Sequence, residues 1–135
     1  RIETPKNSAA ALEGMVEHVK NILAELELPY RILRLCGGDL GFTSALTFDF
    51  EIYSAAQERW LEISSVSTFN SFQAERLQLR YKDNSGKKQS VHTLNGSSLA
   101  LPRVVAGLLE NCQTPEGILL PKALVPYTGF DRISH

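Results

Sequence analysis

The stretch LTFDFEIYSAAQERWLEISSVS, residues 46–67, decides the fold of this chain. Apolar residues stand at every second position of its first part, namely Leu46, Phe48, Phe50 and Ile52. This period of two is typical of a strand that buries one face and exposes the other. Residues 54–59 break the pattern before a second strand-like run at residues 60–67. Two such runs around a short break predict an antiparallel hairpin.

The other face of the first strand carries two carboxylates, Asp49 and Glu51. Residues two apart project from the same side of a strand, so these two side chains are neighbours. They form either a solvated surface or one wall of a cleft. The sequence leaves both interpretations open.

The segments around the hairpin predict further helices and strands. Residues 8–28 repeat apolar side chains at steps of three and four, which indicates a helix with one buried stripe that ends at Pro29. The remaining predicted elements are a strand at 30–35, a glycine turn at 36–41, a short helix at 71–78, a strand through Tyr81, a polar turn at 82–88 typical of solvated surface, a strand at 89–95, a helix capped by Ser97 or Ser98, and an irregular tail beyond residue 114. This order predicts an α+β fold in which helices flank an antiparallel sheet.

Composition narrows the class of protein. The 135 residues are 43% hydrophobic, which suffices for one buried core, and the formal net charge of -1 does not favour a polyanion. No apolar run approaches the roughly 18 residues of a membrane span, so we expect a cytoplasmic protein without a membrane partner. Cys36 and Cys112 lack the spacing of a disulfide framework or a zinc site. Because the chain starts at Arg1 and its only methionine, Met15, lies in a predicted helix, we expect a piece of a longer protein.

The segment WLEISS, residues 60–65, carries oxygen ligands on a predicted strand. Glu62 and the serines that follow are ligands of the kind that Mg²⁺ takes alongside phosphates and water. An exposed glutamate on a strand is the ordinary alternative. In a regular strand Glu62 and Ser65 point to opposite faces, so a shared metal role requires a bulge between them.

The segment HTLNGSSLALPR, residues 92–103, passes from a strand into a helix around Asn95, Gly96 and Ser97. Gly96 lets a ligand approach the backbone closely. Arg103 offers a planar cation that can bind a phosphate through two hydrogen bonds. The alternative is a glycine turn, a capping serine and a surface arginine.

Taken in order, these segments resemble the class II seryl-tRNA synthetases from about residue 8 to residue 127. The matching stretches are LPYR (28–31), LCGGDLGF (35–42), EISS (62–65), FQA (72–74), RY (80–81), HTLNGS (92–97), LEN (109–111) and PY (126–127). The resemblance implies that residues 1–135 are the C-terminal portion of a catalytic domain, with the third class II motif at about 92–112. It implies a parent serine-tRNA ligase that activates L-serine with ATP to seryl-adenylate and transfers it to tRNA(Ser).

The resemblance also implies roles for individual residues. Glu62, Ile63, Ser64 and Ser65 would line the ATP site, with Glu62 and Ser65 facing Mg²⁺. Arg103 would be the third-motif arginine that faces ATP, and Arg103 and Glu62 would carry the catalytic roles. Asn95 and Ser97 would hold the serine substrate.

Some positions depart from the family pattern. Pro102 stands where the family usually has glycine, and Leu46 where it often has lysine; Val66, Thr68 and Phe69 replace residues of a commoner Cys-Ser-Asn-Cys run. The first and second motifs and the tRNA-gripping helical arm would precede Arg1, so we expect a homodimeric parent and an isolated piece without activity. The alternatives are a related adenylating enzyme that loads a carrier protein and a non-catalytic interaction domain derived from a synthetase.

Overall fold

The hairpin predicted from residues 46–67 forms the centre of the fold. In the computed structural model, which describes residues 1–134, β3 (Leu46–Ser54) and β4 (Arg59–Thr68) pair antiparallel along their whole length. Phe50 and Ile52 of β3 are completely buried, as the period of two predicts. The prediction of this hairpin is confirmed.

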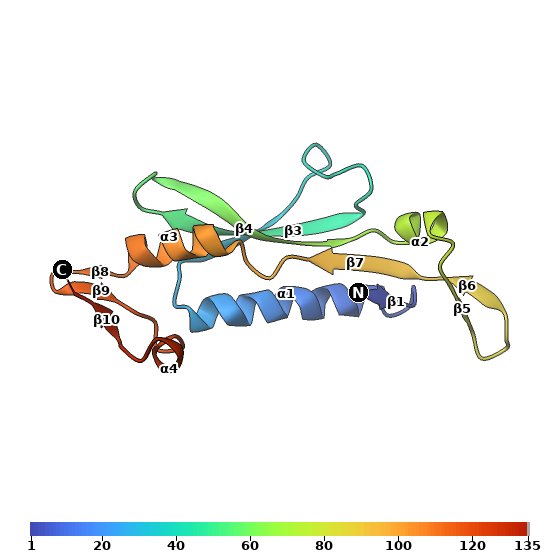
Figure 1. Ribbon diagram of the computed structural model, residues 1–135. Helices are drawn as coiled ribbons and strands as arrows, with labels where there is room; N and C mark the ends of the chain where they lie inside the picture. The colour runs from blue at the N-terminus through green and yellow to red at the C-terminus, as the bar shows by residue number, and fades with distance from the viewer. Residues whose placement is uncertain (135) are drawn as a thin grey trace.

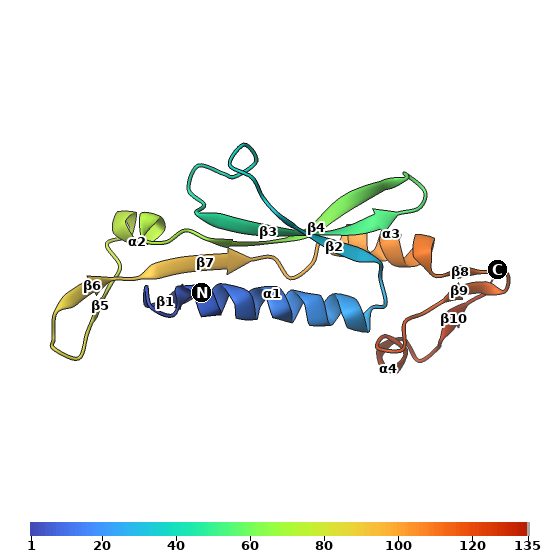
Figure 2. The ribbon, with the colours of Figure 1, turned by 180° about the vertical axis from the view of Figure 1, so that it is seen from behind.

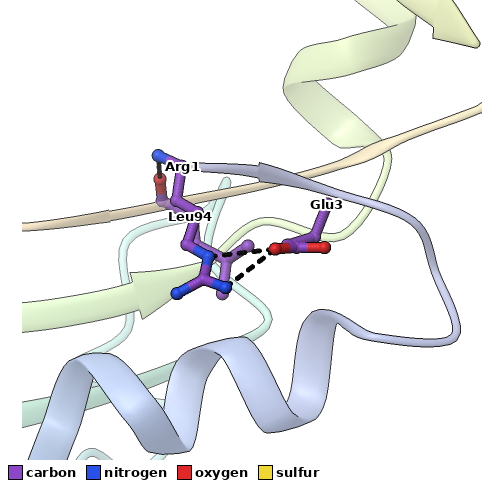
Figure 3. A network of polar contacts seen from close by, with 3 residues as sticks. All are labelled: Arg1, Glu3 and Leu94. Carbon is purple, nitrogen blue, oxygen red and sulfur yellow. Dashed lines mark hydrogen bonds and ion pairs between the residues drawn. The ribbon is translucent and has the colours of Figure 1, made fainter.

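The hairpin belongs to a five-stranded sheet with the strand order β1-β7-β4-β3-β2 (Figure 1). The added strands, all antiparallel to their neighbours, are β1 (Ile2–Glu3), β7 (His92–Gly96) and β2 (Tyr30–Arg34). At the edge of the sheet the backbone nitrogen of Arg1 donates to the Leu94 carbonyl over 2.7 Å, and its guanidinium pairs with Glu3 at 2.8 Å (Figure 3). The predicted α+β class with an antiparallel sheet is confirmed.

Two helices, α1 (Ser8–Glu25) and α3 (Leu101–Asn111), cover one face of this sheet (Figures 1 and 2). Their apolar sides and the sheet share one core, which includes Leu12, Leu23, Phe50, Ile52, Ile63, Val66, Val104 and Leu108. α1 ends before the predicted limit because Glu27 takes a left-handed backbone conformation, with a φ of 53°. The opposite face is left to the polar side chains of β3 and β4.

A small extension lies at the start of β7, away from α3 (Figure 1). It consists of α2 (Phe72–Arg76) and a separate hairpin made of β5 (Arg80–Lys82) and β6 (Lys88–Ser90). The strand predicted at 89–95 is therefore divided, since β6 ends at Ser90 and β7 begins at His92. The predicted polar turn between the two strands of the hairpin is confirmed.

The prediction of an irregular tail is wrong in part. β8 (Gln113–Thr114), β9 (Gly117–Leu119) and β10 (Arg132–Ile133) form a three-stranded sheet, and α4 (Val125–Thr128) precedes β10. Gly117 makes this sheet possible, because its φ of 130° and its close approach to the Ile133 backbone exclude a side chain. Strands of two or three residues are too short for an alternating pattern to reveal them.

Two expectations from composition can be compared with the structure. Within residues 1–134, no helix has both the length and the apolar character needed to cross a membrane. Cys36 and Cys112 are free thiols, as their spacing predicts.

Candidate functional site

An extra residue in β4 brings Glu62 and Ser65 to the same face of the sheet. Directly opposite residues of paired strands share a face; Glu62 lies opposite Glu51, and Ser65 lies opposite Asp49. Three steps along β4 therefore match two steps along β3, and the register shifts at this point. Such an extra residue is a β-bulge. The bulge that a shared role of Glu62 and Ser65 requires is confirmed.

The two residues between them, Ile63 and Ser64, turn toward the face that the helices cover. Each is only 1% exposed. Ile63 packs in the core, and its carbonyl accepts a hydrogen bond from the Ala100 N–H over 2.6 Å. The Ser64 hydroxyl donates to the Ser97 carbonyl. Both residues were expected to line the ATP site. Their side chains are buried under the helices, so only their backbone atoms can take part at the polar face.

β7 ends at Gly96, but the irregular segment that follows stays hydrogen-bonded to the edge of β4 up to the start of α3. The Ser97 N–H donates to the Ser65 carbonyl over 3.1 Å, and further along the Arg103 Nη1 donates to the Glu62 carbonyl. The guanidinium of Arg103 is thereby fixed beside a residue 41 positions earlier in the chain. This edge brings the two predicted site segments together.

This path makes the predicted helix cap wrong. α3 begins at Leu101 after Ala100, and no side chain caps it. The Ser97 hydroxyl instead accepts a hydrogen bond from the Ser65 N–H over 3.1 Å, so it belongs to the sheet edge. Pro102 lies in the first turn of α3, where its missing N–H costs no helical hydrogen bond. The departure from the family pattern at this position leaves the helix intact.

The polar face continues onto β7 at Asn95. This residue is exposed and lies opposite Ser67, whose hydroxyl bonds that of Thr47 over 2.7 Å. Ser97 follows two residues later, also exposed. Because its oxygen accepts the bond from the sheet edge, its own proton stays available for a ligand. The residues that the structure gathers along this edge are Glu62, Ser65, Asn95, Ser97 and Arg103.

Asp49 is the residue of this face whose importance the sequence left undecided. Its Oδ1 atom is buried and has no hydrogen-bond partner among the described residues. Glu51, by contrast, accepts a bond of 2.6 Å from Arg31 Nε, and Arg31 also lies over the Trp60 ring. A buried carboxylate oxygen without a partner is costly, and such a place suits a cation or a donor. Only the strand register reveals that this carboxylate faces Ser65.

The charge around Glu62 is mostly negative. Its pKa is raised above the ordinary value of 4.5, first by partial burial and then by the charge of Asp49, while Arg103 opposes the shift and Glu51 adds to it. In residues 1–134, no group of three or more His, Cys, Asp or Glu side chains is arranged to hold a metal ion. Mg²⁺ in proteins commonly takes one or two carboxylates and completes its coordination with phosphates and water.

Replacing Glu62 with glutamine is expected to stabilise the metal-free protein at about pH 8 more than at about pH 4. The folded protein binds the Glu62 proton more tightly than the unfolded chain, so wild-type stability falls as the pH rises from 4.5 through the raised pKa. Glutamine does not ionise and escapes this loss. Melting temperatures in a chelator at both pH values measure the difference, with Glu13→Gln on the exposed side of α1 as the control. An equal difference at both pH values would contradict the prediction.

Comparisons with known proteins extend over nearly the whole chain. The model of the tRNA synthetase class II core domain (G, H, P, S and T) matches residues 1–112. The chain is 57% identical over 135 residues to the serine-tRNA ligase of Salinibacter ruber and 53% identical over 134 residues to that of Chromobacterium violaceum. These alignments cover 98% of this chain but 32% and 31% of the relatives.

Solved structures agree with the sequence relatives. The crystal structure of seryl-tRNA synthetase from Pyrococcus horikoshii complexed with ATP matches with a TM-score of 0.92 at 36% identity, covering 98% of this chain and 30% of that one. The chain thus spans about a third of the length of the relatives it matches. Since the family model matches most of the chain, the protein belongs to the class II tRNA synthetase core domain family.

Proposed function

We propose that the chain is the C-terminal portion of the catalytic domain of a serine-tRNA ligase, with the third class II motif at about residues 92–112. One observation carries this proposal: the segment after β7 is bonded along β4, so that Arg103 and Ser97 lie beside Glu62 and Ser65. The relatives named serine-tRNA ligases and the solved neighbour complexed with ATP support it. These names favour the ligase over a carrier-loading enzyme or a non-catalytic domain.

In the proposed reaction the serine carboxylate attacks the α-phosphorus of ATP, and pyrophosphate leaves. Negative groups meet in this step, so cations placed beforehand lower its barrier. One nitrogen of the Arg103 guanidinium is bonded to the Glu62 carbonyl, which leaves the other donors free for phosphate oxygens. An arginine that is already anchored loses less freedom when phosphate binds. Ser65 adds a hydroxyl, and Ile63 and Ser64 contribute backbone groups.

The donor set of the polar face fits Mg²⁺. Asp49 offers a buried oxygen that has no hydrogen-bond partner among the described residues, and its negative charge beside Glu62 is the kind of charge that a cation compensates. Glu62 and Ser65 would hold the ion, because Mg²⁺ takes one or two carboxylates and fills its other positions with phosphates and water. When bound, the ion neutralises phosphate charge.

Asn95 and Ser97 hold the serine substrate in this proposal. The Ser97 hydroxyl retains a proton to donate, and the Asn95 amide both donates and accepts. A site that bonds a hydroxyl rejects analogues without one far better than an apolar pocket rejects an added methyl group. These two side chains would therefore select serine over alanine.

The partners and surroundings of the whole protein are part of the proposal. The parent would bind tRNA(Ser) mostly through regions outside this chain, form a homodimer and work in the cytoplasm. The 135 residues alone would lack activity, because they hold one wall of the ATP and serine site. The relatives, which are about three times as long, support this division.

Serine-dependent exchange of labelled pyrophosphate into ATP by the full-length protein tests the proposed function. We expect exchange with serine and little with alanine, and none from the 135-residue piece at comparable concentration. A full-length protein that exchanges with another amino acid and not with serine would overturn the assignment. Exchange by the isolated piece at the rate of the full-length protein would overturn the statement that it lacks activity.

Replacing Ser97 with alanine is expected to raise KM for serine about 10-fold, because one hydrogen bond to the substrate is lost. The preference for serine over alanine should fall by a similar factor, while KM for ATP stays nearly constant. Steady-state exchange kinetics with both amino acids measure these changes. Ser98→Ala, at the exposed neighbouring position, is the matched control. A larger effect on ATP than on serine would contradict the role of Ser97.

A further inference from the structure

We propose that Phe42 and the basic arm, defined as α2 with the β5–β6 hairpin (residues 71–90), bind single-stranded RNA. The inference rests on the proposed function, because an RNA substrate is what such a surface would serve. The arm carries five basic residues, Arg76, Arg80, Lys82, Lys87 and Lys88, against two acidic ones, Glu75 and Asp83. Its net charge is thus positive in a chain whose net charge is -1. Basic charge gathered on one extension is the usual electrostatic mark of a nucleic-acid contact.

An aromatic platform lies beside this charge. The Phe42 ring is 90% exposed although it contacts Phe72 edge to face, with ring centres 5.8 Å apart. On the same ring of Phe72 lies the Arg76 guanidinium, 3.4 Å from its centre. An exposed phenylalanine next to a stacked arginine presents flat surfaces on which unpaired bases stack.

Within residues 1–134 the lysines of the hairpin form no ion pair with a carboxylate. Lys82 lies directly opposite Lys88, an arrangement of like charges that destabilises a strand pair. Among the described residues none of the arm's basic side chains forms an ion pair, and Asp83 is engaged by the turn itself. Hydrogen bonds, first from the Ser85 hydroxyl and then from Gln89, lower the pKa of Asp83 to about 2. The repulsion between the lysines is relieved when a polyanion binds.

Hydrogen bonds tie α2 to the start of the hairpin and to β7, which leads to the proposed site. Arg80 Nη1 donates to the carbonyls of Ala74 and Leu79 at 3.3 and 2.8 Å, joining α2 to the hairpin. The Thr93 hydroxyl donates to the Gln73 side chain over 2.8 Å, joining α2 to β7. β7 then runs from His92 to Gly96, a distance of roughly 16 Å for its five residues, and Ser97 follows it. RNA on the arm would therefore lie one strand length from the serine-binding residues.

Single-stranded RNA fits this surface better than a duplex or a membrane. A duplex hides the faces of its bases, so an exposed aromatic ring gains little from it. A membrane would need a broad apolar face rather than one ring among charges. The sequence alone suggested solvated surface for the turn at 82–88, and the structure adds an aromatic pair at α2, in the same extension.

Binding of tRNA by the full-length protein tests the inference. The probe is a fluorescent transcript of a tRNA that the protein aminoacylates, either intact or without its unpaired 3′ nucleotides, at salt concentrations between about 50 and 200 mM. Phe42→Ala is compared with Phe42→Trp, which keeps a stacking ring. Lys82→Gln/Lys88→Gln is compared with Lys122→Gln/Arg132→Gln, which removes the same charge from exposed positions outside the arm.

We expect Phe42→Ala to weaken binding of intact tRNA about 5- to 150-fold, the range for one stacked base, and to leave the shortened tRNA unaffected. The tryptophan variant should retain affinity. The double lysine variant should reduce the slope of log Kd against log salt by about 1.4, at about 0.7 for each phosphate contact, and the control should not. Equal losses with both RNAs, or an unchanged salt slope, would overturn the inference.

The exchange reaction separates this inference from the proposed function, because it needs no RNA. A full-length protein without serine-dependent exchange would refute the proposed function. Normal exchange with unaltered RNA binding in all arm variants would refute only the RNA surface.

Discussion

Replacing Arg103 with alanine is expected to lower kcat/KM for serine-dependent pyrophosphate exchange by about 10²- to 10³-fold, the usual cost of removing one prearranged stabilising group. The guanidinium is held at the sheet edge before ATP binds, since Nη1 donates to the Glu62 carbonyl. Its remaining donors then neutralise phosphate charge as pyrophosphate leaves. The loss should appear in kcat and in KM for ATP, while KM for serine changes little.

Two further variants separate charge from geometry at this position. Arg103→Lys keeps the positive charge but not the planar fork, so it should recover only part of the activity. Arg59→Ala removes an exposed arginine from the start of β4, at the turn of the hairpin and outside the proposed site residues, and should leave exchange unchanged. Because the Arg103 bond is exposed, its loss should reduce the free energy of unfolding by about 1 kcal/mol or less. A loss of exchange smaller than 10-fold, or one confined to serine binding, would remove Arg103 from the ATP site.

Replacing Gly107 with leucine is expected to lower the free energy of unfolding by about 1–3 kcal/mol, the range for overpacking a core. α3 crosses β3 so closely here that even an added β carbon would collide with Cδ1 of Ile52. Ile52 is fully buried, so its side chain can move only by displacing its neighbours in the core. A leucine needs more room than one β carbon, so either this packing or the position of α3 must change. Because Arg103 lies one helical turn before Gly107, exchange activity should fall as well.

Replacing Gly107 is expected to destabilise the protein, whereas helix propensity alone would predict a stabilisation. The sign of the change in the free energy of unfolding therefore distinguishes the two effects. Alanine in place of a helical glycine normally stabilises by about 1 kcal/mol. Gly14 of α1 has open space around its α carbon, so Gly14→Ala should show this gain. Calorimetric unfolding of the full-length protein measures both variants. Phe50 is fully buried, so the unfolding transition that Phe50→Ala shifts to lower temperature is the transition of this domain. A Gly107→Leu variant as stable as the wild type would show that α3 is free to move.

The parts of the fold that sequence predicts well are those where one strand or helix face is buried along many residues. The alternation of β3 and the apolar stripe of α1 are long enough to indicate both type and orientation. The short strands of the tail, such as β8 and β9, contain too few residues to show a period. The bulge in β4 was predictable for another reason: the chemistry expected of Glu62 and Ser65 requires them on one face.

The sequence predicted most of the residues of the candidate site but not how they are arranged in space. A serine before an apolar periodic run is the ordinary signal of a helix cap, yet Ser97 bonds Ser65 at the sheet edge. Asp49 gave no signal of its own, because a carboxylate on a polar strand face is usually solvated. Its position opposite Ser65 depends on the pairing of β3 with β4. The positions of Ser97 and Asp49 both depend on how distant segments pair, which the pattern of neighbouring residues does not record.

By itself the sequence determined the α+β class, the central hairpin and the two segments that carry the oxygen ligands and the arginine. Only the tertiary structure decided that Arg103 reaches the Glu62 carbonyl, that Ser97 leaves the helix for the edge of β4, and that Ile63 and Ser64 turn into the core. The physical reason is the range of the forces involved. Periodic burial acts over a few neighbouring residues, whereas hydrogen bonds at a strand edge join residues 32 and 41 positions apart, which no local pattern records.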